Sequence, residues 1–439
     1  MKHLIVNVAG LGWETCQRFG LKEINGFKFK PAHSVFPAVT CTAQASLRTA
    51  TLPREHGMVA NGVFLRNLQR PAFWEQSSKL VDGERIWATA KKKGYTVGMF
   101  YFQQSLGESV DELISPWPIH KHHGGMILKN YSRPINKHPN GYDEDFPLHK
   151  YWGPLADAKV GNRIVNDIIS FAECDIAFVY IPTLDYDLQR YPATDKHCAK
   201  AISLLNQQLQ KLFDFAKAQN AEITILGDYE ITEVTLPPAQ PNLTLRRAGL
   251  FAVRNVLGRL YPDFNHSRAF AMVDHEIAHV YIKNEADIPI VKNCLNASGD
   301  YWLIEERVPK TDWAHSNSGE LLIQAKQGSW CAYPWWTLPK EAPDYASHID
   351  IHSKPGYDPC ELFFERWAFP PKTCQDLTRI KGTHGHKCEI AYLSTLPQIF
   401  LRFFLLTTQK LWKIFGKGFV EIASAIKQWC DDLPAKGVY

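Results

Sequence analysis

Short apolar runs rich in β-branched and aromatic residues alternate with helix-like segments along the first half of the chain. Four such runs are Leu4–Val8, Tyr95–Phe102, Ala177–Ile181 and Ile223–Leu226. Continuous apolar runs of this length are typical of parallel strands that are buried on both faces. The alternation therefore predicts an α/β fold with a mostly parallel central sheet and helices on both faces.

Acidic residues follow two of these predicted strands. Asp185 comes shortly after Ala177–Ile181, and Asp228 comes directly after Ile223–Leu226 and a glycine. In open α/β sheets, chemistry collects at the carboxyl ends of the strands. We therefore expect both carboxylates to lie in a functional site at that edge of the sheet.

The second half of the chain is less regular. Residues 237–343 begin with several prolines and end in an aromatic cluster. This predicts a small insert or cap over the sheet, inside a domain that spans residues 1–396. The cluster could line a slot for an apolar group, although such clusters more often belong to the core. Its members are Trp330, Tyr333, Trp335 and Trp336.

From about residue 397 to 439 the chain becomes an amphipathic tail in which basic residues interrupt apolar ones. Arg402 and Lys410 break the apolar run well below the ~20 residues that a membrane-spanning helix needs. Such a tail can pack on its own domain or on a partner. A peripheral contact with a membrane surface is the alternative, because the basic residues would favour anionic lipids.

The amino-acid composition limits which binding partners and which cellular location are expected for the protein. The chain has 439 residues, and its 49 Lys and Arg residues against 45 Asp and Glu give a net charge of only +4. Nucleic-acid polymers are therefore not expected as partners, whereas a local patch could attract a small phosphorylated substrate. The ten cysteines are scattered and form no C-x-x-C pair. Together with the lack of a signal-peptide core at the N-terminus, this predicts free thiols and a cytoplasmic protein.

Closely spaced motifs near the N-terminus carry a family resemblance. Phe36–Thr40 reads Phe-Pro-Ala-Val-Thr, Leu52–Gly57 contains Pro-x-x-His-Gly, and Asn61 follows. This pattern resembles the signature of the nucleotide pyrophosphatase/phosphodiesterase branch of the alkaline phosphatase superfamily. The segment Gly83–Ala90 is similar to a helix-strand unit of the same family. The resemblance covers residues 1–250 and the segment around His384, and it implies an alkaline-phosphatase-like fold.

The resemblance implies that Thr40 is the nucleophile and that Asn61 stabilises the transferring phosphoryl group. A threonine hydroxyl becomes a useful nucleophile when a metal ion and a helix N-terminus stabilise its alkoxide. An asparagine amide can donate to the developing charge on a phosphoryl oxygen. Taken singly, Thr40 could merely cap a helix and Asn61 could merely form a turn.

Members of the family hold two metal ions with three aspartates, three histidines and the nucleophile. Asp185, Asp228 and His384 match three of these positions. Where the family has two more histidines, this chain has Gln189 and Tyr229.

The remaining family aspartate is replaced by Ala9. Two carboxylates and one imidazole would balance two divalent ions poorly. We therefore expect at most one tightly bound ion, Zn²⁺, Mn²⁺ or Mg²⁺, with Asp185 and His384 as its main ligands. An ion near Gln189 would be bound weakly or be one of the harder metals. His352 could substitute as a ligand, and His275, His279 and Glu230 are further candidates.

The leading hypothesis is a metal-dependent hydrolase of phosphodiester or pyrophosphate bonds that forms a phosphothreonine on Thr40. The alternative is a non-catalytic phosphate- or nucleotide-binding protein that keeps the fold but has degraded metal sites. The sequence does not identify the substrate, because specificity lies in loops outside these motifs.

Overall fold

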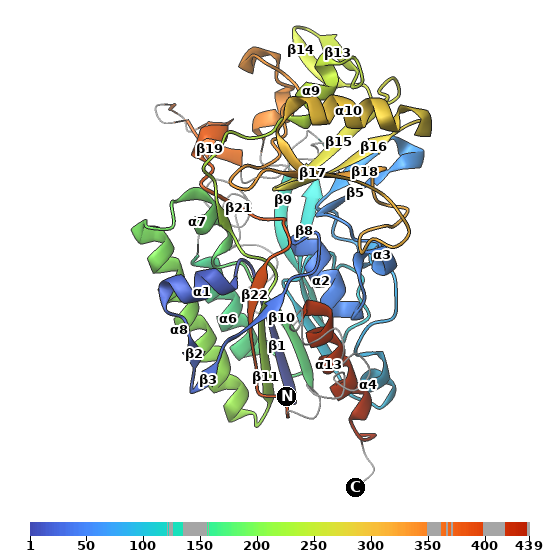
Figure 1. Ribbon diagram of the computed structural model, residues 1–439. Coiled ribbons are helices and arrows are strands. Elements are labelled where there is room, and N and C mark those ends of the chain that lie inside the picture. The colour runs from blue at the N-terminus through green and yellow to red at the C-terminus, as the bar shows by residue number, and fades with distance from the viewer. Residues whose placement is uncertain are drawn as a thin grey trace.

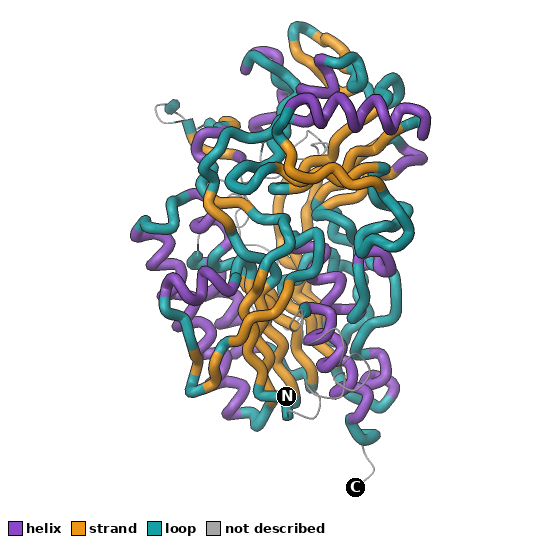
Figure 2. Tube along the Cα trace, in the orientation of Figure 1, coloured by secondary structure: helices purple, strands orange, loops and turns teal. Residues whose placement is uncertain are grey.

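The computed structural model describes residues 1–120, 122, 126–134, 156, 158–348, 361–365, 368–369, 372–397 and 418–436. A central sheet of eight strands dominates the structure (Figures 1 and 2). In spatial order its strands are β4 (Lys30–His33), β22 (Glu389–Ser394), β11 (Glu222–Gly227), β1 (His3–Val8), β10 (Ile176–Ile181), β7 (Val97–Phe100), β8 (Glu112–His120) and β9 (Met126–Arg133).

The middle of the sheet is parallel. Parallel pairing joins five successive strands, β11, β1, β10, β7 and β8. The strands on either side, β22 and β9, run antiparallel to their neighbours. The strands predicted from the apolar runs all lie in this parallel part. Every residue of β1 and β10 is buried, which explains why these strands are almost continuously apolar.

Strand register brings the ends of the three central strands to one level. Val8 at the end of β1 pairs with Ile181 of β10 and with Gly227 of β11. The segments that follow these strands therefore emerge side by side. A side chain at Gly227 would not fit, because its Cβ would lie 2.0 Å from the Leu11 carbonyl oxygen.

Helices cover both faces of the sheet (Figure 1). α6 (Val160–Phe171) and α8 (Lys196–Ala218) cover one face, and α2 (Thr40–Thr49) and α4 (Ala88–Lys92) cover the other. α8 begins where the Asp195 carboxylate accepts a hydrogen bond from the His197 backbone N–H. Shorter helices are α1 (Trp13–Phe19), α3 (Pro53–His56) and α7 (Asp185–Arg190). The predicted α/β fold is confirmed.

A smaller antiparallel sheet lies beyond the carboxyl edge of the central sheet, at the top of Figure 1. Its order is β15 (Ala269–Asp274), β16 (Ile277–Ile282), β18 (Leu321–Ala325) and β17 (Tyr301–Glu306). α9 (Pro241–Arg247), α10 (Ile288–Ser298) and the hairpin of β13 (Val253–Val256) and β14 (Arg259–Pro262) accompany it. The whole unit falls within the predicted insert 237–343.

The aromatic cluster of the insert is part of the core. Trp330, Tyr333, Trp335 and Trp336 are all buried. The Trp335 ring lies 5.0 Å from that of Tyr333 and 5.2 Å from that of Trp336, centroid to centroid. Tyr333, Trp335 and Trp336 therefore pack against one another, whereas Trp330 lies in a separate, smaller buried cluster with Phe363 and Ile380.

Short two-stranded ribbons complete the fold. They pair β2 (Glu23–Ile24) with β3 (Phe27–Lys28), β5 (Gly62–Leu65) with β6 (Arg70–Phe73), β12 (Thr232–Glu233) with β21 (Gly382–Thr383), and β19 (Leu362–Phe364) with β20 (Thr373–Gln375). The β12 and β21 ribbon joins the segment after β11 to the late segment that carries His384.

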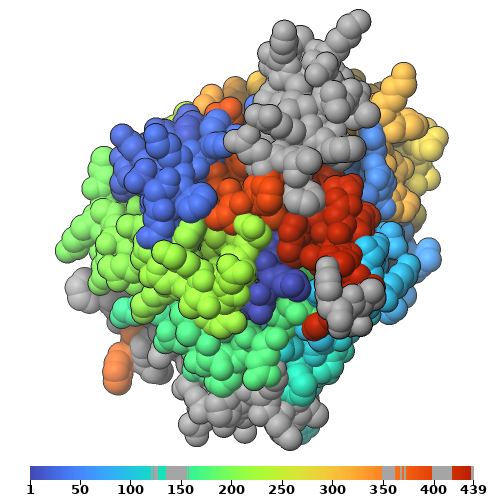
Figure 3. Space-filling view, turned by 90° about the horizontal axis from the view of Figure 1, so that it is seen from below, coloured from blue at the N-terminus to red at the C-terminus, as the bar shows by residue number. Residues whose placement is uncertain are grey.

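The last described helix, α13 (Phe419–Asp432), packs on the domain. It contacts α2 and α4, and its Trp429 ring meets the His3 ring edge-on at 4.8 Å. Figure 3 shows this red helix beside the dark blue N-terminal residues. Arg402 and Lys410, which prompted the membrane expectation, lie outside the described residues. In the described part of the chain, no helix is both long enough and apolar enough to span a membrane.

Candidate functional site

Thr40 is the first residue of α2 and is buried. The free N–H groups of a first helical turn carry partial positive charge, which favours anions at this place. The Thr40 hydroxyl lies 3.3 Å from the Tyr229 hydroxyl. The predicted nucleophile is therefore placed at a helix N-terminus and is hydrogen-bonded to a second hydroxyl group.

Tyr229 is the residue next to Asp228, after β11. Its hydroxyl donates to Asp185 Oδ1 over 2.9 Å. Its ring stacks on the His384 ring, with centroids 3.6 Å apart and planes at 4°. Burial, reinforced by the charges of Asp185 and Asp228, raises the pKa of the Tyr229 hydroxyl well above its ordinary value. Tyr229 is therefore a neutral phenol that can donate to Asp185 and accept from Thr40.

Asp185 and Gln189 lie one turn apart on α7, which begins shortly after β10. The Gln189 Nε2 group donates to Asp185 Oδ1 over 2.8 Å. The same Asp185 oxygen thus accepts hydrogen bonds from both Gln189 and Tyr229. Gln189 Oε1 is buried and has no hydrogen-bond partner in the described part of the chain.

Asp228 lies at the carboxyl end of β11 and is completely buried. Its Oδ1 accepts hydrogen bonds from the Gly10 N–H at 3.0 Å and the Tyr229 N–H at 2.9 Å. Gly10 has φ of 67°, a conformation that glycine adopts without strain. Asp228 Oδ2 is buried and lacks a partner among the described residues. Burial, with a further contribution from the Asp185 charge, raises the pKa of Asp228 well above its ordinary value.

His384 reaches the site from the late loop of the chain. Its Nδ1 bonds the Ala38 carbonyl oxygen at 3.0 Å, so Nδ1 carries the proton and Nε2 does not. Burial, and then the neighbouring His275, lower the pKa of His384 well below its ordinary value. The His275 and His384 rings lie 3.8 Å apart, centroid to centroid.

Asn61 lies beside the first turn of α2, as the predicted role requires. Its Oδ1 accepts from the Cys41 backbone N–H at 2.9 Å, so it caps the helix. Its Nδ2 donates to Asp274 Oδ1 at 2.9 Å, and its backbone N–H donates to Asp274 Oδ2 at 2.7 Å. Asp274 ends β15, so the tip of the β15–β16 hairpin reaches down from the second sheet to this site.

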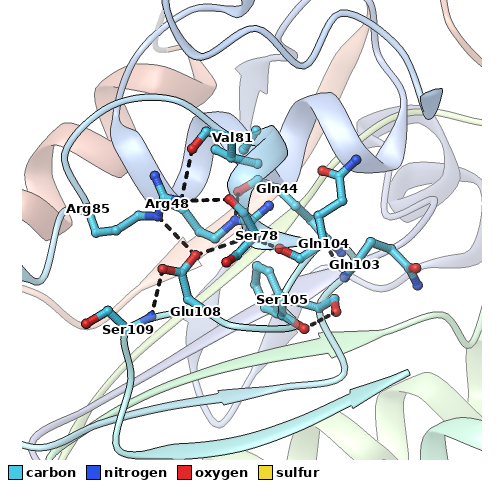
Figure 4. A network of polar contacts seen from close by, with 12 residues as sticks. Gln44, Arg48, Ser78, Val81, Arg85, Gln103, Gln104, Ser105, Glu108 and Ser109 are labelled. Atoms are coloured by element: carbon cyan, nitrogen blue, oxygen red, sulfur yellow. Dashed lines mark hydrogen bonds and ion pairs between the residues drawn. The ribbon is translucent and has the colours of Figure 1, made fainter. Parts of the chain in front are cut away.

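A polar network holds α2 two turns beyond Thr40 (Figure 4). The fully buried Arg48 donates to the Gln104 carbonyl oxygen at 2.7 Å and pairs with Glu108 at 3.4 Å. Arg85 approaches the same Glu108 oxygen at 3.0 Å. Burial lowers the pKa of Arg48 to about 10, against the opposing effect of Glu108. The network ties α2 to the loop after β7 and thereby fixes the helix that presents Thr40.

The donor set does not fit the two-ion centre of the family. Among the residues that the structure describes, no three His, Cys, Asp or Glu side chains are placed to hold a metal ion together. Hydrogen-bond donors of Tyr229 and Gln189 face Asp185, where the resemblance implies imidazole ligands. Asp228 keeps one unpartnered oxygen. The single ion expected on Asp185 and His384 stays a prediction.

The other candidate ligands lie elsewhere. His279 Nε2 is hydrogen-bonded to the Val59 carbonyl oxygen, and Glu230 accepts from Thr15 at the start of α1. His352 lies outside the described residues. His275 does reach the site, where its ring lies tilted by 33° against the ring of His384.

The structure thus brings together at one edge of the central sheet the side chains of Thr40, Asn61, Asp185, Gln189, Asp228 and His384. Asp185 and Asp228 were expected at this edge, and the roles of all six residues stay predictions. Sequence reasoning missed the bridging role of Tyr229 and the hydrogen bonds from Asn61 to Asp274. Tyr229 was visible as a substitution at an expected imidazole position, which was the signal available for it.

Comparison with known protein families assigns residues 3–358 to the family described as type I phosphodiesterase / nucleotide pyrophosphatase. The chain belongs to this family. The resemblance of the N-terminal motifs to the nucleotide pyrophosphatase/phosphodiesterase family is confirmed. No curated protein sequence matches the chain.

Two solved structures share the fold at low sequence identity. Phosphonoacetate hydrolase from Sinorhizobium meliloti, in complex with phosphonoformate, has a TM-score of 0.58 and 11% identity, covering 98% of this chain and 96% of that one. An inactive form of murine ectonucleotide pyrophosphatase/phosphodiesterase 5, in complex with AMP, has a TM-score of 0.53 and 14% identity, covering 90% of this chain and 87% of that one. At these identities the similarity establishes the fold alone.

Proposed function

We propose that this family member hydrolyses a phosphodiester or pyrophosphate bond of a small phosphorylated substrate, with Thr40 as nucleophile. One observation carries the proposal: the Thr40 hydroxyl is hydrogen-bonded to Tyr229, which in turn donates to Asp185. A nucleophile held by a neighbouring group that a third group orients is the arrangement found in activated nucleophiles. The position at the N-terminus of α2 adds stabilisation of negative charge.

The reaction follows from these contacts. The Thr40 oxygen attacks phosphorus, and its proton moves to the Tyr229 oxygen while the Tyr229 proton moves to Asp185. The bond to the leaving oxygen breaks, and that oxygen departs with the electron pair. Water then attacks phosphorus, and the bond from phosphorus to the Thr40 oxygen breaks. The proton held on Asp185 returns through Tyr229 to the Thr40 oxygen, while water loses one proton to the solvent, from which the first leaving oxygen takes one up.

No step of this proposal runs through a metal ion, because the described donor set does not fit the family's two-ion centre. Metal dependence was part of the expectation from the sequence, and it is tested together with turnover.

A nucleotide is the first substrate class to examine. The murine relative is described in complex with AMP, and the family is described by pyrophosphatase activity on nucleotides. The near-balanced charge of the chain disfavours nucleic-acid polymers. The substrate that we propose is therefore a small nucleotide or a related phosphorylated molecule.

The test is turnover of a p-nitrophenyl ester of a nucleoside monophosphate by the full-length protein. The assay runs after chelator treatment and again with added Zn²⁺, Mn²⁺ or Mg²⁺. We expect release of p-nitrophenol in at least one of these conditions. A folded protein that is inert in all of them would overturn the proposed activity.

A non-catalytic nucleotide-binding protein is the second candidate, and the hydrogen bonds of Asn61 favour it. In the proposed hydrolysis the Asn61 amide would contact the transferring phosphoryl group. In the structure its oxygen accepts a hydrogen bond from the Cys41 backbone N–H, and its nitrogen donates one to Asp274. AMP titrated into the protein by calorimetry separates the two candidates. Binding without turnover in every metal condition would support the binding protein.

A further inference from the structure

We propose that Tyr229 and Gln189 together replace the metal ion beside Thr40, so that the native chain does not hold a divalent ion on Asp185. The inference concerns the same site as the proposed hydrolysis and goes beyond it. The inference holds whether or not Thr40 turns over a substrate, because it concerns which groups stabilise the negative charge of the Asp185 carboxylate.

The first observation is that two donors converge on one carboxylate oxygen. The Tyr229 hydroxyl reaches Asp185 Oδ1 at 2.9 Å, and Gln189 Nε2 reaches the same atom at 2.8 Å. A carboxylate oxygen that binds a metal ion directs a lone pair at it from about 2.0–2.2 Å. Both donors compete with an ion for the lone pairs of this oxygen. Hydrogen bonds thus stabilise the Asp185 charge in the way that a cation would.

The second observation is the polarity of the two substituted side chains. Metal ligands present lone pairs, as a neutral imidazole nitrogen does. The resemblance implies imidazoles at both positions, whereas Gln189 and Tyr229 turn N–H and O–H groups toward Asp185. The amide orientation is fixed by chemistry, since the Gln189 oxygen would repel the carboxylate. The two substitutions are complementary, because each supplies a donor to the same acceptor.

The third observation is that Tyr229 is held in place. Its ring stacks on His384 at 3.6 Å, and it is fully buried. Its hydroxyl also lies 3.3 Å from Thr40 Oγ1, the other oxygen that a metal ion would bind. To admit an ion, Tyr229 would have to lose the stack and both hydrogen bonds at once. The site is therefore closed by a packed side chain.

The experiment restores the imidazoles. Full-length wild-type protein and the double variant Tyr229→His/Gln189→His are stripped with chelator and titrated with Zn²⁺ by calorimetry. We expect no saturable binding that depends on Asp185 in the wild type. The double variant should gain saturable binding of one Zn²⁺ ion, because two imidazole ligands are restored beside Asp185. Adding Asp185→Asn to the double variant should abolish that binding.

Several outcomes would overturn the proposal. Wild-type protein that binds one Zn²⁺ and loses it on Asp185→Asn would show that Tyr229 does not replace the ion. A double variant that keeps the wild-type circular dichroism spectrum but binds no Zn²⁺ would show that this is not a converted metal site. Because Tyr229 is buried, Gln189→His alone serves as a second variant. If that variant binds Zn²⁺ through Asp185, the Tyr229 side chain does not exclude an ion from the site, and the proposal is contradicted.

The experiment measures metal binding and not turnover. Failure of this inference can therefore be distinguished from failure of the proposed hydrolysis. A protein that hydrolyses the nucleotide ester without bound metal satisfies both proposals. A protein that binds Zn²⁺ on Asp185 and hydrolyses the ester refutes only this one.

Discussion

The ring of Tyr229 lies flat on the ring of His384, with centroids 3.6 Å apart and planes at 4°. This contact joins the segment after β11 to the late loop, next to the ribbon of β12 and β21. It sets Tyr229 so that its hydroxyl meets both Thr40 and Asp185. The arrangement of the proposed nucleophile thus depends on a contact between distant parts of the chain.

Thr40→Ala should abolish turnover of the nucleotide ester and leave the free energy of unfolding almost unchanged. A single hydroxyl bond of this kind contributes about 1 kcal/mol to stability. Thr42→Ala is the matched control, because Thr42 is also buried on α2 and its hydroxyl has no hydrogen-bond partner within the described residues. Equal activity in Thr40→Ala and Thr42→Ala would remove Thr40 from the mechanism.

Tyr229→Phe should lower kcat by roughly 10²–10⁴ and change KM little, since a proton-transferring group typically contributes this much. The phenylalanine ring can keep the stack on His384 while the hydrogen bonds to Thr40 and Asp185 are lost. Tyr301→Phe is the control, because Tyr301 lies in the second sheet and its hydroxyl has no partner in the described structure. An unchanged kcat in Tyr229→Phe would show that its hydroxyl is not needed.

Unfolding should become easier in mild acid because of buried histidines, of which His56 is one. His56 Nδ1 accepts from the Met58 N–H and Nε2 bonds Ser46, so the ring must stay neutral. Burial lowers the pKa of His56 to about 3 from 6.5. The unfolded chain therefore binds more protons in this window, so the stabilisation is complete above pH 6.5 and is lost as pH falls toward 3.

Urea titrations at pH 7.5 and pH 5.0 test this dependence. His56 should account for roughly 2 kcal/mol of the loss between these two pH values. His56→Gln, which does not titrate, should show a smaller loss by about that amount. His348→Gln is the control at an exposed histidine. An identical pH dependence in wild type and His56→Gln would contradict the assignment of a neutral His56.

Glu108→Gln should destabilise the protein by roughly 3–5 kcal/mol, because it leaves the buried charge of Arg48 without the carboxylate that balances it. Glu84→Gln, at an exposed position on the same stretch of chain, should change the free energy of unfolding little. The comparison is made by urea unfolding. A loss below ~1 kcal/mol in Glu108→Gln would show that the pair does not hold α2, since exposed ion pairs are worth only that much.

The sequence was sufficient to predict the sheet and the edge that carries the site. Parallel strands buried on both faces leave a strong apolar pattern. Asp185 comes shortly after one of them and Asp228 directly after another. Thr40 and Asn61 were found because their motif lies within a short stretch of chain. Such features are local in the sequence, which is why they could be predicted.

Contacts between distant segments could not be predicted in the same way. Nothing in the sequence indicates that the β15–β16 hairpin carries Asp274 to Asn61, because this depends on how the second sheet packs on the first. The substitution by Tyr229 was visible, but its effect depends on the length of the side chain and on the His384 ring beneath it. The membrane contact given as the alternative for the tail, and the ligand role of His352, stay untested.

The most direct test of the account is to trap the covalent intermediate. Wild-type protein is mixed with the p-nitrophenyl nucleotide ester, quenched in acid within the first turnover, digested and examined by mass spectrometry. The account predicts a nucleotidyl adduct on the peptide that contains Thr40, and no adduct in Thr40→Ala. Turnover by the wild type with an adduct on another residue, or undiminished turnover by Thr40→Ala, would contradict it.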